Sequence, residues 1–161
     1  MKKRFLLLII LLFCLSGCSK RVNNPYEVVK GTSILSYYDT RDNIDIEGFN
    51  VLEMNPQNIL DQNNSIIVNE NGVIRCITIT DDTVKTFRSI SVGDKIEKIE
   101  HSFNHESLFN NVYLVLFNNN IEEDPANQDK EDTWIWIAYY TDGSQITFIK
   151  IYDVLYGRAW R

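Results

Sequence analysis

The chain has 161 residues, 44% of them apolar and 12% aromatic, a composition too hydrophobic for intrinsic disorder and sufficient for one domain with its own core. Residues 1–17 hold three basic side chains and no acidic one, so the remaining 144 residues carry 13 basic and 22 acidic groups, a formal charge of −9. Such an acidic chain is not expected to bind nucleic acid.

The chain begins with the pattern of an export signal. Lys2, Lys3 and Arg4 precede an unbroken apolar run from Phe5 to Leu15. This run is too short for a membrane-spanning helix, which needs about 20 residues. The pattern therefore predicts a signal peptide over residues 1–17. An ordinary secretory signal and an uncleaved anchor are the alternatives.

The four residues Leu15-Ser16-Gly17-Cys18 resemble the lipobox of bacterial lipoproteins, in which an apolar residue and two small residues precede the lipid-bearing cysteine. The resemblance implies cleavage before Cys18 and a diacylglyceryl group, with chains such as palmitate, on its sulfur. Two or three acyl chains bind a bilayer far more firmly than one. We therefore expect a lipid anchor on the extracytoplasmic face of the cell membrane, or in the outer membrane of a bacterium that has two.

This processing divides the chain into three parts. Residues 1–17 are the signal peptide, residues 18–25 are the lipidated cysteine and a tether, and residues 26–161 form a single domain. The tether reaches at most about 25 Å, so the domain is expected close to the bilayer.

Cysteine usage agrees with this division. Cys14 is removed with the signal peptide and Cys18 carries lipid, so Cys76 remains alone and no internal disulfide is expected. Cys76 lies in an apolar strand pattern, which is typical of a buried, inert thiol.

Two β-hairpins are predicted from tight turns. The joining dipeptides, Asn71-Gly72 and Asp142-Gly143, both accept the positive φ angles of a type I′ turn. The strands that they join are Ser65–Glu70 with Val73–Thr80, and Thr133–Thr141 with Ser144–Asp153.

The second strand of each hairpin changes its apolar face part-way along. The apolar positions are offset by one residue after Cys76 in the first hairpin and after Phe148 in the second. Because a one-residue slip turns side chains to the other face, each of these strands is predicted to contain a β-bulge, and partial cover of both faces of the sheet is the alternative.

The strongest helix signal covers Asp94 to Asn104. Asp94 and Glu97 have the spacing of a capping box. The apolar residues around them recur on one side of a helix; these are Val92, Ile96, Ile99 and Phe103. A shorter helix is predicted to begin at Asn55-Pro56, and a helical turn at Asn24-Pro25 is predicted to end at Gly31.

These elements predict an α+β fold, in which an antiparallel sheet of hairpins is packed by one or two short helices. Residues 48–81 and residues 89–153 share the same order of elements: an extended apolar pair, a capped helix and a hairpin. Two fused related units would explain this order, and chance similarity between two Ile-rich segments is the alternative. The matched residues after the turns are Ile74, Cys76, Ile77, Ile79 and Asp81 with Ile146, Phe148, Ile149, Ile151 and Asp153.

The sequence Val92-Gly93-Asp94 opens the longer predicted helix, and antiparallel strands follow it. Behind a lipobox, this order resembles the β-lactamase-inhibitor-protein-like superfamily, which includes small outer-membrane assembly lipoproteins. Two features depart from that pattern: Ser89 stands where a glycine usually opens the second unit, and the cysteine pair of the inhibitors is absent. The resemblance implies a protein-binding or scaffolding role carried by an open sheet face, and it does not imply β-lactamase inhibition.

The histidines have the spacing of a zinc site but not its other ligands. His101 and His105 lie four residues apart on the predicted helix, facing away from its apolar side. Ser102 stands where a zinc protease has its glutamate. The acidic segment between Asn118 and Thr133 lacks the residue order of a calcium loop and predicts a solvated loop. We therefore expect no metal and no cofactor.

Trp134, Trp136 and Tyr140 share one face of a predicted strand. Aromatic residues at alternate positions can stack on wall sugars or on a partner protein. In a central strand they are more often core residues. These three residues are therefore the candidate binding residues, and burial in the core is the alternative.

The sequence contains no phosphate loop, nucleophile elbow or dinucleotide fingerprint. It therefore favours a membrane-anchored, non-catalytic binding or scaffolding module of the cell envelope. The expected partners are the membrane, through lipid on Cys18, and an envelope protein or cell-wall component. The alternative hypothesis is an envelope hydrolase or metal-dependent enzyme that uses His101 and His105.

Overall fold

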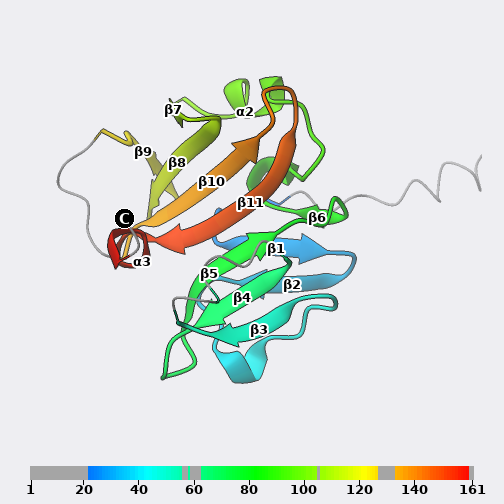
Figure 1. Ribbon diagram of the computed structural model, residues 1–161, viewed down its shortest axis with the longest axis vertical. Coiled ribbons are helices and arrows are strands. Elements are labelled where there is room, and N and C mark those ends of the chain that lie inside the picture. The colour runs from blue at the N-terminus through cyan, green and yellow to red at the C-terminus, as the bar shows by residue number, and fades with distance from the viewer. Residues whose placement is uncertain (1–21, 56–57, 59–62, 105, 127–132, 160–161) are drawn as a thin grey trace, which may run out of the picture.

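The computed structural model describes residues 22–55, 58, 63–104, 106–126 and 133–159 (Figure 1). These residues form a large mixed sheet of eight strands and a small antiparallel sheet of three. The small sheet has the order β2-β1-β6 and consists of β1 (Glu27–Lys30), β2 (Ser33–Ser36) and β6 (Val84–Lys85). The large sheet has the order β3-β4-β5-β11-β10-β8-β7, with β9 also paired to β8. Its strands are β3 (Asn50–Glu53), β4 (Ser65–Val68), β5 (Ile74–Ile79), β7 (Glu106–Phe109), β8 (Val112–Asn118), β9 (Ile121–Glu123), β10 (Ile135–Thr141) and β11 (Ile146–Asp153).

The expected α+β fold is wrong, because the structure is mainly β and its helices are too short to form a layer. The α-helices of the described residues are α2 (Glu97–Glu100), with four residues, and α3 (Val154–Ala159), with six. The 3₁₀ turns η1 (Arg41–Asn43) and η3 (Phe87–Ser89) have three residues each. The large sheet is also mixed rather than antiparallel, because β3 runs parallel to β4.

The predicted helix over Asp94–Asn104 shrinks to α2 because its first residues pair with the start of β11. The backbone N–H of Gly93 donates to the carbonyl of Ile146 at 2.8 Å, and that of Ile146 donates to Asp94 at 2.9 Å. The Asp94 carboxylate accepts from the Ser91 N–H at 2.8 Å instead of capping the helix. The predicted apolar side is nevertheless packed, since Ile99 and Phe103 are buried.

The helical turn expected at Asn24-Pro25 is also wrong. Asn24 forms a turn that leads into β1, with its side-chain oxygen accepting from the Tyr26 N–H at 3.0 Å. Gly31, at φ +60°, belongs to the turn between β1 and β2. The helix predicted from Asn55-Pro56 falls mostly outside the described residues.

The core lies between the large sheet on one side and, on the other, the small sheet together with residues 87–103. The face of the large sheet that we call the core face contributes residues such as Ile77, Ile137 and Ile151. The small sheet contributes Val28 and Leu35 to the same cluster. Because side chains alternate along a strand, the intervening residues lie on the opposite face, which we call the outer face.

Both predicted hairpins are confirmed as β4–β5 and β10–β11, but their turns are not type I′. In each joining dipeptide the glycine alone has a positive φ, +73° at Gly72 and +95° at Gly143. Positive φ at two successive turn residues, the mark of type I′, occurs at Asn110-Asn111 between β7 and β8 and at Asn119-Asn120 between β8 and β9. Asparagine enters this region more readily than most residues.

The two predicted bulges are confirmed as one-residue shifts of register. In β5 the extra residue is Arg75, because Ile67 pairs with Cys76 and Val68 pairs with Ile74. In β11 the extra residue is Thr147, because Tyr140 pairs with Phe148 and Thr141 with Ile146. Arg75 and Thr147 occupy matching positions of the two halves of the chain.

Strands β5 and β11 pair antiparallel inside the large sheet, so the two hairpins lie side by side (Figure 1). Ile77 opposes Ile151 and Ile79 opposes Ile149. Because Ile77 matches Ile149 and Ile79 matches Ile151, this crosswise pairing is what a local two-fold axis between the strands produces. Descent of the halves from one duplicated unit stays a prediction.

Candidate binding surface

The two tryptophans of the predicted aromatic face are buried. Trp134 is 7% exposed and Trp136 is 6% exposed. Both belong to an outer-face cluster with Leu116 of β8 and Val154, the first residue of α3. Because α3 begins directly after β11 and packs here, the indole rings present little surface to a ligand.

Tyr140 is half-buried on the same outer face and stacks on Phe148, with ring centroids 3.9 Å apart and planes at 13°. The strand register extends this pair across the sheet, since Tyr140 opposes Val112 and Val112 opposes Phe109. We call Phe109, Val112, Tyr140 and Phe148 the outer-face row. Phe109, at its end, is 67% exposed.

The outer-face row ends at an open edge of the large sheet. Within the described residues, β7 pairs with β8 alone. Leu108 is 59% exposed and points to the opposite side from Phe109. An edge strand with large exposed apolar side chains is an unprotected template for another strand.

Acidic groups surround the Leu108 side of this edge. Tyr113 opposes Leu108, and its hydroxyl donates to Oε1 of Glu100 at 2.9 Å. Burial raises the pKa of Tyr113, and the hydrogen bond to Glu100 and the charges of Glu106 and Glu97 raise it further. One side of the edge therefore combines the exposed Leu108 with acidic groups, and the other side, with Phe109, is apolar.

Cys18 lies outside the described residues, but the chain is packed into the domain from Val22 onward. Val22 is 2% exposed, and its carbonyl accepts a hydrogen bond from the Arg88 N–H at 2.9 Å. Four Cα steps separate Cys18 from Val22, a span of at most about 14 Å. Within the segment expected to be a tether, residues 18–25, the chain is therefore packed into the domain from Val22 onward.

Arg88, which hydrogen-bonds Val22, is itself held by contacts of its side chain. Its guanidinium lies 4.9 Å from the ring centroid of Phe87 and 4.8 Å from that of Phe103, and its Nη2 is 3.4 Å from Oε2 of Glu122. Arg88 and Ser89 both have left-handed φ angles, 58° and 60°. Ser89 is the position where the superfamily pattern has glycine, the residue that adopts this conformation without strain.

A buried polar network joins β5, β11 and α3. Arg75 Nη2 lies 3.0 Å from Oδ2 of Asp153, and the Tyr37 hydroxyl donates to the Arg75 carbonyl at 2.7 Å. Oδ1 of Asp153 accepts from the Tyr156 N–H at 2.6 Å, which caps the first turn of α3. These polar groups are bonded to one another across β5, β11 and α3, which is the arrangement of a network that stabilises the fold.

The histidine pair cannot be placed as a pair, because His105 lies outside the described residues. His101 is exposed at the end of α2, where its Nδ1 contacts the Glu97 carbonyl. In the part of the chain that is described, no three His, Cys, Asp or Glu side chains gather as a metal site would require. Of the acidic segment, Glu122 accepts a hydrogen bond from the Asn104 N–H and pairs with Arg88.

Cys76 is fully buried on the outer face. Burial raises the pKa of its thiol to about 11, so the thiol stays protonated at neutral pH. It lacks the thiolate that a nucleophile needs.

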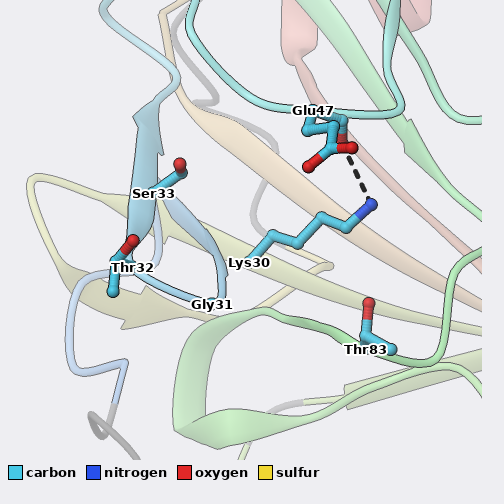
Figure 2. Close-up of a pocket in the computed structure, with 6 residues that line it drawn as sticks. All are labelled: Lys30, Gly31, Thr32, Ser33, Glu47 and Thr83. Carbon is cyan, nitrogen blue, oxygen red and sulfur yellow. Dashed lines mark hydrogen bonds between the residues drawn. The ribbon is translucent and has the colours of Figure 1, made fainter.

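A shallow cavity of about 380 Å³ lies beside the turn between β1 and β2 (Figure 2). Lys30 crosses it, and its Nζ donates to the Glu47 carbonyl at 3.0 Å and lies 3.0 Å from Oδ2 of Asp81. Thr83 donates to the other Asp81 oxygen from its hydroxyl at 2.6 Å and from its N–H at 2.8 Å. The hydrogen bonds from Thr83 and the Lys30 ammonium lower the pKa of Asp81 to about 2. Lysine and aspartate thus neutralise each other and link β1 to the chain after β5.

No protein-family model, no curated protein and no solved structure matches this chain. The resemblances to bacterial lipoproteins and to the β-lactamase-inhibitor-protein-like superfamily therefore rest on the quoted motifs alone. The geometry itself singles out β7 and the outer-face row.

Tyr140 of this row is among the candidate binding residues predicted from the sequence, and Phe109 and Phe148 are not. A usable signal was present in Leu108-Phe109-Asn110-Asn111-Val112, where two residues tolerant of positive φ stand between apolar residues. Interpreting this segment as a hairpin would have placed Phe109 opposite Val112.

Proposed function

We propose that this chain is a lipoprotein of the bacterial cell envelope, anchored through Cys18, whose domain is a non-catalytic binding module. The observation that carries the proposal is the position of the lipobox. Cys18 stands four residues before Val22, which is buried and hydrogen-bonded into the domain. A lipid on Cys18 would hold the domain directly against the extracytoplasmic surface of the bilayer.

The residues between Cys18 and Val22 favour this placement. Lys20 and Arg21 would lie at the headgroups, where each basic residue contributes about 1 kcal/mol toward anionic lipid. Among the described helices, none has the length and apolar character needed to cross a membrane.

The binding role is supported by apolar side chains that the fold leaves in contact with water. Leu108 and Phe109 are 59% and 67% exposed on β7, which pairs only with β8 in the described part of the chain, and the rest of the outer-face row continues from Phe109. Contiguous exposed apolar surface of this kind marks interaction sites. The partner is an envelope protein or a cell-wall component.

Replacing the lipid-bearing sulfur tests the anchoring. In cells fed labelled palmitate, the Cys18→Ala chain should lose its label, keep residues 1–17 and change its distribution between membrane and soluble fractions, because the acyl acceptor is gone. The matched control is Cys14→Ala, which alters a cysteine of the removed segment and should be labelled like the parent. Undiminished labelling of the Cys18→Ala chain would refute the proposal.

A further inference from the structure

Among the described residues, only β8 pairs with β7, so the backbone groups of β7 that point away from β8 lie at defined positions. In an antiparallel ladder, hydrogen-bonded and non-hydrogen-bonded pairs alternate. Counted from the turn at Asn110-Asn111, the Phe109–Val112 pair is hydrogen-bonded and the Leu108–Tyr113 pair is not. The N–H and C=O groups of Leu108 and Glu106 therefore point away from β8, toward the open edge.

The side chains of β7 divide between two environments. Glu106 and Leu108 lie on the core-face side, where the Glu100 carboxylate accepts the Tyr113 hydroxyl at 2.9 Å. Phe109 lies on the outer-face side, where it continues into Val112 and Tyr140. A strand added beside β7 would alternate its own side chains between these environments.

From this arrangement we infer that β7 binds an extended segment of a partner protein in which basic and apolar residues alternate. The main-chain groups of Leu108 and Glu106 bind the segment as an additional strand. Its basic side chains lie over Leu108, with their charged ends at Glu100 and Glu106, because lysine and arginine cover apolar surface with their stems. Its apolar side chains extend the outer-face row.

Charge decides against a second copy of this chain as the occupant. Two β7 strands paired with each other would bring together two sets of Glu97, Glu100 and Glu106, and the exported part already carries a formal charge of −9. Like charges brought together in this way oppose association. A basic segment removes this repulsion.

This inference rests on the proposed binding function and adds the chemistry of the partner. The probe is a blocked decapeptide of alternating lysine and valine, titrated into the protein purified from membranes in neutral detergent micelles. The control peptide has the same composition, with all lysines before all valines. We expect saturable binding of the alternating peptide alone, weakening as salt rises from ~0.05 to ~0.5 M, and slower hydrogen exchange at the Leu108 and Glu106 amides.

Two variants of β7 and one matched control locate the site. Leu108→Pro removes an outward N–H while the pairing with β8 keeps its hydrogen bonds, and it should weaken binding about tenfold or more. Glu106→Lys keeps every main-chain group and should weaken binding about tenfold through charge alone. Ile34→Lys changes a residue that is 42% exposed on the edge strand β2, and it should bind like the parent. Thermal unfolding of each variant checks its fold, and Glu106→Lys decides the question if Leu108→Pro unfolds.

The outcomes separate this inference from the proposed anchoring. Equal binding of both peptides, equal binding by Glu106→Lys and Ile34→Lys, or no binding by the parent would overturn it. Self-association of the parent that Leu108→Pro abolishes would assign the edge to a second copy and also overturn it. Palmitate labelling of the same preparation reports anchoring independently: labelled protein that ignores the peptide contradicts only the inference, and unlabelled protein that binds it contradicts only the anchor.

Discussion

Ser89 keeps a backbone conformation that suits glycine. Its φ is 60°, next to Arg88 at 58°, and such left-handed angles cost most residues roughly 1–2 kcal/mol. The conformation persists because the neighbouring Arg88 is fixed by Val22, by two aromatic rings and by Glu122.

Ser89→Gly should therefore stabilise the protein. We expect a gain of about 0.5 to 1 kcal/mol in the free energy of unfolding, since relief of strain exceeds the added entropy of an unfolded glycine. Urea denaturation measures it. Ser89→Ala keeps the strained Cβ and should show no gain, so equal behaviour of the two variants would contradict the interpretation.

Asp81 should make stability depend on pH in the acid range. Its pKa is lowered from 3.8 to about 2 in the folded protein by Thr83 and Lys30. The charged form is therefore favoured by folding, so its contribution is complete above the unfolded pKa and is lost as pH falls through the folded one. Asp81→Asn should be less stable than the parent at pH 7, and the difference should vanish between about pH 4 and pH 2. A difference that persists below pH 2 would argue against this origin.

Substitutions on β10 test whether the outer face is buried where α3 begins and exposed farther along the strand. Trp136 packs on Leu116 and Val154 and is 6% exposed, so Trp136→Ala should cost about 3 to 5 kcal/mol in unfolding free energy. Tyr140 on the same strand face is half-exposed, and Tyr140→Ala should cost clearly less. A Trp136→Ala protein as stable as the Tyr140→Ala protein would instead support the expectation that Trp136 is an exposed binding residue.

Local patterns predicted the elements that local interactions determine. The hairpins at Asn71-Gly72 and Asp142-Gly143 followed from their turn residues. The change of apolar face after Cys76 and after Phe148 predicted the bulges, whose extra residues, Arg75 and Thr147, each come one residue before these positions. The helix over Asp94–Asn104 failed because distant residues compete for its backbone: Gly93, Asp94 and Ile96 pair with residues 144–146. Periodicity alone cannot show such competition.

The candidate site was only partly predictable for the same reason. Tyr140 was identified from its aromatic neighbours along one strand. The row it belongs to exists only after β7, β8, β10 and β11 are set in register, which brings Phe109 and Phe148 into line with it. The burial of Trp136 likewise depends on α3, which no sequence signal predicted.

At the scale of the whole molecule, the two hairpins meet crosswise through β5 and β11, and the chain beyond them takes different forms. On the side of β5, the next strands across the sheet are β4 and then β3, which runs parallel to β4. On the side of β11, the next strands are β10, β8 and the edge strand β7. The proposed binding edge therefore belongs to the second half alone. Val22 is hydrogen-bonded to Arg88, so the proposed anchor at Cys18 and the proposed binding edge would belong to one folded unit.

The most direct test of the account is the mass of the N-terminal peptide of the protein purified from membranes. The account predicts a peptide that begins at Cys18 and carries a diacylglyceryl group on sulfur. A free thiol at Cys18, or a cytosolic chain that still contains residues 1–17, would contradict it.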